Sequence, residues 1–364
     1  MEKKGYLLLA NGQLYEGVLR GAKKAALAEL VFTTSVVGYM DALTDPAYAG
    51  RILVQTFPVM GCYGVVPLED ENARPALSGY VVRQLVDTPS NFRCIGKLDD
   101  YLAEHGVTCI EGVDTRAIAR AIRDQGVMNA AILTEKPEDI EAACEEIKAW
   151  KFTASVTEAS CEDVIPAATK GINHVVVLDL GAKADAVSEL EKRGCAVTIV
   201  PADMTSKAIL AFNPDGVLLT NGPGDPAEHT DIITEVQILA EERVPMFGIG
   251  LGHQILALSQ GAQVVRLAYG HRGGNQPLKD VKTGTNYISS QNHGFAVDGE
   301  SLPEGASVRF INTNDGSCEG MDYADMPAFS VQFQPQACGG PQDTRMLYDR
   351  FIAMMGGNRN AAES

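Results

Sequence analysis

The sequence predicts an α/β protein with two domains, a mixed α/β domain followed by a doubly wound, mostly parallel sheet. Three observations lead to this prediction. A chain of 364 residues is long enough to form two separate hydrophobic cores. From His174 onward, apolar runs alternate with helical patterns, as they do in sheets built from βαβ units. Two glycine-rich loops each directly follow an apolar run, at the strand end where such sheets bind ligands.

The first domain is predicted to span residues 1–150 and to mix strands with helices. Residues 6–19 should form a hairpin, because two strand-like runs flank the turn sequence Asn11-Gly12. Asp114 stands at the start of a helical pattern, where a carboxylate caps free backbone N–H groups. Further strands are expected at residues 30–34, 79–85 and 107–110. Helices are expected at residues 97–105, 114–123 and 138–150.

A linker is predicted at residues 151–173, because small and polar residues dominate there without helical or strand periodicity. The second domain is therefore predicted to span residues 174–364. Its strands are expected at residues 174–180, 195–200, 216–220, 244–249, 287–291 and 329–333. Its helices are expected at residues 184–193, from residue 205 onward, and at residues 230–242, 251–257 and 343–355.

Residues 244–257 form the stretch around which the second domain is organised. An apolar run ends in the alternating glycines Gly248, Gly250 and Gly252 and passes at once into a helical pattern. Such a strand, sharp turn and helix form the nucleophile elbow of many hydrolases, and Gly250 should stand at its tip. The elbow therefore has the expected shape but carries no nucleophile. A dinucleotide-binding fingerprint does not fit, because His253 stands where its third glycine would fall.

The overall composition argues against several classes of partner. The formal net charge of −17 disfavours binding to nucleic acid and to anionic membranes. No apolar run reaches the ~18 residues that span a membrane, and the first residues show no signal-peptide pattern. The eight cysteines lack a CxxC or Cys/His metal-binding pattern. We therefore expect reduced thiols, no metal site and a cytoplasmic location.

Several segments stand in an order that is typical of one family. Residues 221–226, 247–254, 269–275 and 291–298 resemble the class I glutamine amidotransferase domain of the carbamoyl-phosphate synthetase small subunit. Residues 32–35, 38–39, 43–46, 90–93 and 112–116 resemble the N-terminal domain of that subunit. The resemblance covers essentially the whole chain. One glycine loop alone would carry little weight, but the ordered set is specific.

The resemblance implies a fold for glutamine hydrolysis in which all three catalytic positions are occupied by other residues. The family uses a cysteine nucleophile, a histidine base and a glutamate that orients the histidine. It passes the ammonia to a large subunit that uses ATP and bicarbonate. The corresponding positions in this chain are Gly250, Gln334 and Gln336. Glycine has no side chain to attack the substrate, and the amide of glutamine does not titrate, so it cannot transfer protons.

By the same resemblance, the frame that holds the substrate is largely kept. Ala47 stands where the family usually has a serine that helps to hold glutamine. The backbone N–H groups of Gly224 and Leu251 are expected to point toward one position beside Gly250. The other glutamine-holding positions are Gly222, Gln254, Asn292, Gly294 and Phe295.

Four other residues could be given chemical roles, but each has a simpler structural interpretation. His253, in the first turn of a helix, and His293, in a loop, could act as bases, although no nucleophile is present for them to activate. Cys338 could be a displaced nucleophile, and Asp225 could be a catalytic acid. We interpret the cysteine as an ordinary thiol and the aspartate as a turn residue.

The chain is therefore interpreted as a homologue of the carbamoyl-phosphate synthetase small subunit that does not hydrolyse glutamine. By descent it belongs to carbamoyl phosphate formation, which feeds pyrimidine and arginine synthesis. It is expected to form a heterodimer as the non-catalytic partner of a large subunit. ATP and Mg²⁺ are expected only on that subunit, so no cofactor is expected in this chain. Two alternatives stay open: a module that binds or senses L-glutamine or another small amide, and an active amidotransferase with rearranged catalytic residues.

Overall fold

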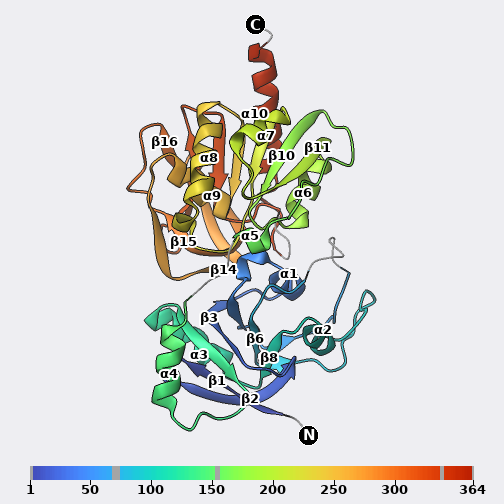
Figure 1. Ribbon diagram of the computed structural model, residues 1–364, viewed down its shortest axis with the longest axis vertical. Coiled ribbons are helices and arrows are strands. Elements are labelled where there is room, and N and C mark those ends of the chain that lie inside the picture. The colour runs from blue at the N-terminus through green and yellow to red at the C-terminus, as the bar shows by residue number, and fades with distance from the viewer. Residues whose placement is uncertain (1–2, 68–73, 152–155, 337–339, 363–364) are drawn as a thin grey trace. The chain divides into compact units, whose positions relative to one another are not determined.

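The computed structural model describes residues 3–67, 74–151, 156–336 and 340–362. The chain forms two compact units (Figure 1). The first unit consists of residues 1–154 and takes in residues 271–273, and the rest of the chain forms the second unit.

Seven strands of the first unit close into a barrel in the order β1-β2-β8-β6-β4-β3-β9. The first two strands form the predicted hairpin, in which Leu8 lies opposite Leu14. Strands β3, β4, β6 and β8 run parallel to one another, whereas β1, β2 and β9 join them through antiparallel pairs. The strands are β1 (Lys4–Leu9), β2 (Leu14–Gly21), β3 (Ala26–Thr33), β4 (Arg51–Gln55), β6 (Gly79–Val82), β8 (Thr108–Glu111) and β9 (Met128–Leu133).

The barrel corrects two parts of the sequence-based prediction. Strands β4 and β9 were not expected, and β4 is buried at every residue, so no polar alternation marks it. The single strand expected at residues 79–85 is wrong. It is divided after Val82, and β7 (Gln84–Leu85) pairs with β5 (Val59–Met60) in a separate two-stranded sheet. Both differences arise because a strand's partner is chosen by contacts far away in the sequence.

The helices of the first unit pack on this barrel. Helix α3 contributes Ile118 and Ile122 to the same apolar cluster as Leu30 and Val54 of the barrel. The predicted cap of this helix is formed, since Asp114 Oδ1 accepts a hydrogen bond from Ala117 N at 2.9 Å. The helices are α1 (Tyr39–Leu43), the 3₁₀ helix η1 (Pro46–Tyr48), α2 (Leu98–Glu104), α3 (Thr115–Gln125) and α4 (Ile140–Ala149).

A nine-stranded sheet forms the centre of the second unit, in the order β11-β10-β12-β13-β18-β17-β16-β14-β15. Its first five strands pair in parallel, as predicted. From β18 onward the sheet continues through antiparallel pairs with β17, β16 and β14. The strands are β10 (Asn173–Asp179), β11 (Cys195–Pro201), β12 (Gly216–Leu219), β13 (Met246–Ile249), β14 (Val264–Asp280), β15 (Asn286–Val297), β16 (Ala306–Asn312), β17 (Cys318–Tyr323) and β18 (Ala328–Val331).

Helices cover both faces of the parallel part of this sheet (Figure 1). Val176 and Leu178 of β10 belong to the apolar cluster that contains helices α7, α8 and α9. Their neighbours Val175 and Val177 belong to the cluster that contains α6 and α10. Alternate side chains of one strand thus enter opposite cores, so the domain is doubly wound. The helices are α6 (Ala184–Glu191), α7 (Ser206–Ala211), the 3₁₀ helix η2 (Pro226–Glu228), α8 (Thr230–Glu241), α9 (Leu251–Ser259) and α10 (Met346–Ala362).

The segment that the sequence marks as a linker contains a short helix, α5 (Val156–Ala159). Val156 is buried in the same cluster as α8 and α9. Ile165 forms an isolated bridge with Ile199 of β11. Val156 and Ile165 of this segment therefore pack on the second unit.

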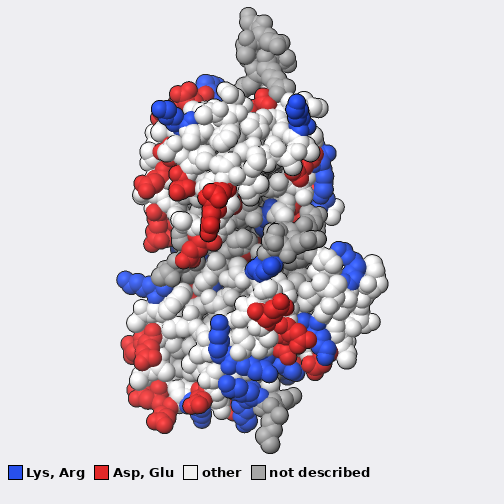
Figure 2. All heavy atoms as spheres, turned by 45° about the vertical axis from the view of Figure 1, so that its right-hand side comes forward, with Lys and Arg blue, Asp and Glu red and all other residues white. Residues whose placement is uncertain are grey.

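The described helices include none that is both long and apolar enough to cross a membrane. On the face drawn in Figure 2, acidic side chains lie in several separate groups with basic side chains between them.

The cap of α3 provides a test of the first unit. Asp114→Ala removes the acceptor for the N–H of Ala117 and should lower the free energy of unfolding by about 1 kcal/mol. Asp124→Ala is the matched control, because Asp124 is an exposed residue of the same helix whose side chain pairs with Arg123. Its effect should stay within about 0.5 kcal/mol. Equal losses in denaturant unfolding would show that the cap does not stabilise α3.

Candidate functional site

The elbow between β13 and α9 is formed as predicted. Gly250 adopts φ 58° and ψ −109°, a conformation that residues with side chains rarely adopt. The N–H of Gly250 donates to Val331 O of β18 at 2.9 Å, and the N–H of Gly252 donates to Thr220 O at 2.9 Å. The turn is therefore bonded both to a neighbouring strand and to the end of β12.

The side chain of Asn221 occupies the space above the elbow. Asn221 follows β12 and is buried, and its Oδ1 accepts a hydrogen bond from Leu251 N at 3.2 Å. A Cβ atom on Gly250 would overlap this oxygen. The N–H of Leu251, which was expected to face an open position beside Gly250, is thus already paired with an amide oxygen of the protein. Sequence reasoning treated Asn221 only as part of a glycine-rich loop and missed this contact.

Gln334 and Gln336 are both buried in the segment after β18. The N–H of Gln334 donates to Ser290 O of β15 at 2.9 Å. The side chain of Gln336 faces α10, where its Oε1 accepts a hydrogen bond from Tyr348 Oη at 3.4 Å. Cys338, the sequence's candidate for a displaced nucleophile, lies outside the described residues.

Several predicted substrate positions also hold the second unit together. Gln254 Nε2 donates to Phe295 O and to Gln332 Oε1, each at 2.9 Å, so it links α9 to β15 and to the segment after β18. Asn292 and Gly294 belong to the same strand as Phe295. A Cβ atom on Gly222 would overlap Leu180 O, and Gly224 has φ +102°. Hydrogen bonding therefore explains the identity of Gln254, and a close contact or a positive φ explains Gly222 and Gly224, without reference to a ligand.

Ala47 lies in the first unit, in the 3₁₀ helix η1, and is buried. Its N–H donates to Asp45 Oδ1 at 3.0 Å, which is a cap of that helix.

The three titratable residues weighed from the sequence that the structure describes, His253, His293 and Asp225, all have structural partners. His253 is fully buried, and its Nδ1 lies 2.7 Å from Ser330 Oγ. Burial lowers the pKa of His253 to about 3, so the ring stays neutral. Asp225 caps η2 by accepting from Ala227 N at 3.0 Å. His293 was expected in a loop but lies within β15, with Nδ1 2.8 Å from Phe295 O.

Two family models match the chain, one in each unit. Residues 7–132 match "Carbamoyl-phosphate synthase small chain, CPSase domain", and residues 176–354 match "Glutamine amidotransferase class-I". The carbamoyl phosphate synthase small chain of Symbiobacterium thermophilum is 42% identical over 354 residues, which cover 95% of this chain and 97% of that protein. The chain belongs to the carbamoyl phosphate synthase small chain family.

Two other small chains match over a similar span. The protein of Staphylococcus epidermidis is 42% identical over 356 residues, covering 98% of this chain and 97% of that protein. The protein of Methanopyrus kandleri is 42% identical over 357 residues, covering 96% of this chain and 98% of that protein. Both domains of a carbamoyl phosphate synthase small chain are therefore represented in this sequence.

The contact between Asn221 and the elbow of this small chain can be measured through Gly250. Gly250→Ala should lower the free energy of unfolding by roughly 1–3 kcal/mol, because it adds strain at a positive φ and displaces Asn221. Gly261→Ala is the matched control, since Gly261 also has a positive φ but open space around its Cβ position. It should cost less than Gly250→Ala.

A double-mutant cycle separates the two causes. In an Asn221→Ala background the oxygen that overlaps the new Cβ atom is gone, so the added cost of Gly250→Ala should fall toward that of Gly261→Ala. If Gly250→Ala costs the same free energy of unfolding in both backgrounds, moving Asn221 away from the elbow does not destabilise the protein.

Proposed function

We propose that this chain is a carbamoyl phosphate synthase small chain that does not hydrolyse glutamine and acts as the non-catalytic partner of a large chain. The observation that carries the proposal is the elbow itself. The position from which a nucleophile would act is Gly250, and the amide of Asn221 lies over it.

The chemistry of amide hydrolysis supports this proposal. Attack on an amide at neutral pH needs a thiolate or an activated hydroxyl, together with a base that accepts its proton. Gly250 supplies no attacking atom, and Gln334 and Gln336 supply only amides that do not titrate. In a serine protease, loss of the catalytic set lowers turnover by on the order of 10⁶, and we expect a comparable loss here.

The described thiols of the second unit are poor substitutes for the missing nucleophile. Burial raises the pKa of the Cys318 thiol to about 12 and that of the Cys161 and Cys195 thiols to about 11. All three are therefore protonated at neutral pH, and a protonated thiol is a weak nucleophile. The alternative of an active enzyme with rearranged residues would have to rely on another group, of which Cys338 is the first to test.

The partner is inferred from the family. The relatives are named small chains of carbamoyl phosphate synthase, and the match covers the N-terminal CPSase domain as well as the amidotransferase domain. A chain that keeps both domains but lacks the hydrolytic groups fits a role in stabilising or regulating a large chain that takes up free ammonia. Two features weaken the alternative role as a glutamine-binding module. Ala47 lacks the hydroxyl of the serine that the family usually has at this position. Asn221 Oδ1 already accepts the hydrogen bond that the N–H of Leu251 could donate to a ligand.

The first test combines hydrolysis with assembly. The purified protein should release no ammonia from glutamine above buffer background, alone or with a carbamoyl phosphate synthase large chain. The reason is that Gly250, Gln334 and Gln336 stand at the three catalytic positions. It should co-elute with that large chain in gel filtration. The complex should form carbamoyl phosphate from ammonium but not from glutamine.

The control is a small chain that carries cysteine, histidine and glutamate at the three positions, assayed with the same large chain. Glutamine turnover within about a hundredfold of that control, lost on thiol alkylation, would contradict the proposal, since oxyanion donors alone leave only a residual rate. Cys338→Ser would then identify the thiol. Failure to co-elute would refute the partner role and leave the absence of hydrolysis intact.

The second test restores the chemistry. Gly250→Cys alone should stay nearly inactive, because it supplies a thiol without a base. Gln334→His and Gln336→Glu must be added, and Ala47→Ser completes the series. Groups that act as a unit are strongly non-additive, so ammonia release should appear only in the combined variants. Efficient hydrolysis by the single Gly250→Cys variant would reveal a base elsewhere and would show that the assignment of Gln334 is wrong.

A further inference from the structure

Helix α3 of the first unit presents a row of arginines to the solvent. Arg116, Arg120 and Arg123 are exposed, whereas Ile118 and Ile122 pack in the apolar cluster of the barrel. Residues that are four and three positions apart lie on the same side of a helix. With a rise of about 1.5 Å per residue, the row is about 10 Å long.

The positive charge of this row is largely uncompensated. Carboxylates pair with several arginines elsewhere in the chain, namely Arg20, Arg51, Arg193, Arg309, Arg345 and Arg350. Among the described residues, no carboxylate forms an ion pair with Arg116 or Arg120. Arg123 pairs with its exposed neighbour Asp124 at 2.7 Å.

The row also costs α3 some of its stability. Arg116 lies four residues before Arg120, and Arg120 lies three residues before Arg123, so like charges repel one another along the helix. Arg116 lies in the first turn, where the helix dipole disfavours a cation. An exposed face that breaks local rules in this way indicates a function outside the helix.

A fourth arginine extends this surface at the N-terminal end of α3. Arg83 is exposed, and its Nη1 donates to Gly112 O at 3.1 Å. Gly112 lies three residues before Thr115, the first residue of α3. The basic face of α3 is therefore defined here as Arg83, Arg116, Arg120 and Arg123.

The chemistry of this face fits an acidic protein surface. A guanidinium group binds a carboxylate through two parallel hydrogen bonds, and arginine is enriched in protein interfaces. The net charge of −17 repels acidic partners from the chain as a whole, so a basic face is where such a partner can approach. A nucleic acid fits less well, because its phosphates would extend beyond a row of about 10 Å onto an acidic protein.

We propose that the basic face of α3 is the surface on which an acidic face of the carbamoyl phosphate synthase large chain docks. This inference rests on the partner role proposed above and adds the place and the charge of the contact. The face belongs to the N-terminal CPSase domain, since α3 lies within residues 7–132. The barrel holds it in place through Ile118 and Ile122.

The test measures the association of the full-length protein with a carbamoyl phosphate synthase large chain as the salt concentration is raised. The association rate of the wild-type protein should fall with salt, because ions screen the charges that steer the encounter. The double variant Arg116→Glu and Arg120→Glu should associate at least about tenfold more slowly at low salt. Its rate should not fall as salt is added.

A stability measurement excludes misfolding as the cause. The double glutamate variant should unfold at the same or a higher denaturant concentration than the wild-type protein. The substitutions remove the like-charge contacts of Arg116 and Arg120 and place an acid in the first turn. The variant Arg116→Gln and Arg120→Gln removes the charges without reversing them, and it should also associate more slowly if the glutamate variant fails to fold.

The matched control is the double variant Lys24→Glu and Lys136→Glu. Both lysines are exposed in loops of the same unit, and the change in net charge is the same. The control variant should associate within about twofold of the wild-type rate, because its charges lie off the docking face. An equal loss in the control and arginine variants would show an effect of net charge alone and would overturn the proposal.

The wild-type measurement separates this inference from the proposed function. If the wild-type protein does not bind the large chain, the partner role fails and the docking face fails with it. If it binds, and the glutamate and glutamine variants bind equally fast, only the docking face is overturned. Self-association of the wild-type protein that these variants lose, with binding to the large chain unchanged, would assign the face to a second copy of this chain and also overturn the proposal.

Discussion

The backbone conformation of Gly250 is the constraint on which the second unit depends. The parallel strand β13 must end and α9 must begin within one residue, which forces φ to 58° and ψ to −109°. Hydrogen bonds from Gly250 to Val331 and from Gly252 to Thr220 bond this turn to the segments on both sides. A nucleophilic side chain at the tip would bear the strain of this conformation, whereas glycine adopts it freely. The elbow therefore keeps its strand–turn–helix geometry with glycine at the tip.

The residues around the elbow are held by contacts within the protein itself. Gln254 bonds to Phe295 O and to Gln332, so its loss would leave buried polar groups unpaired. Asn221 fills the space that a side chain on Gly250 would need and pairs with the N–H of Leu251. Such residues are held in place by the stability of the fold. Their presence in a sequence is accordingly weak support for substrate binding. The absence of titratable groups at Gly250, Gln334 and Gln336 is stronger support for the proposed loss of glutamine hydrolysis.

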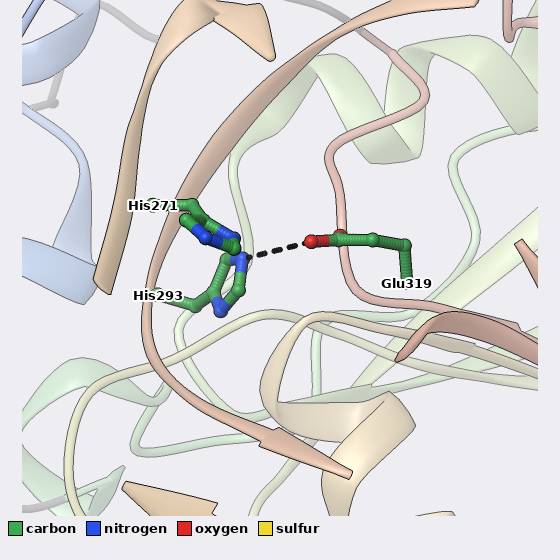
Figure 3. A group of neighbouring side chains, drawn as sticks. All are labelled: His271, His293 and Glu319. Atoms are coloured by element: carbon green, nitrogen blue, oxygen red, sulfur yellow. Dashed lines mark ion pairs between the residues drawn. The ribbon is translucent and has the colours of Figure 1, made fainter. Parts of the chain in front are cut away.

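The antiparallel part of the sheet contains a second polar cluster, which one backbone carbonyl connects to the residues around the elbow. His293 is oriented by Phe295 O, and Phe295 O also accepts from Gln254 of α9. A backbone carbonyl of β15 thus joins the residues around the elbow to those around Glu319. His293 Nε2 lies 3.7 Å from Glu319 Oε1 of β17 (Figure 3), so these contacts extend from α9 through β15 to a third element of the unit.

Local patterns in the sequence determined much of this protein: the hairpin at Asn11-Gly12, the cap at Asp114, the alternation of strands and helices from residue 174, and the elbow at Gly250. Each of these features depends on residues that are close together in the chain, so a local sequence pattern is enough to predict it. Only the tertiary structure decided the closure of the barrel through β4 and β9, the division of residues 79–85 and the antiparallel strands β14, β16 and β17. It also decided the position of Asn221 over Gly250 and the pairing of His293 with Glu319. These features join residues far apart in the chain, and packing and unpaired polar groups select such contacts only once the whole fold has formed.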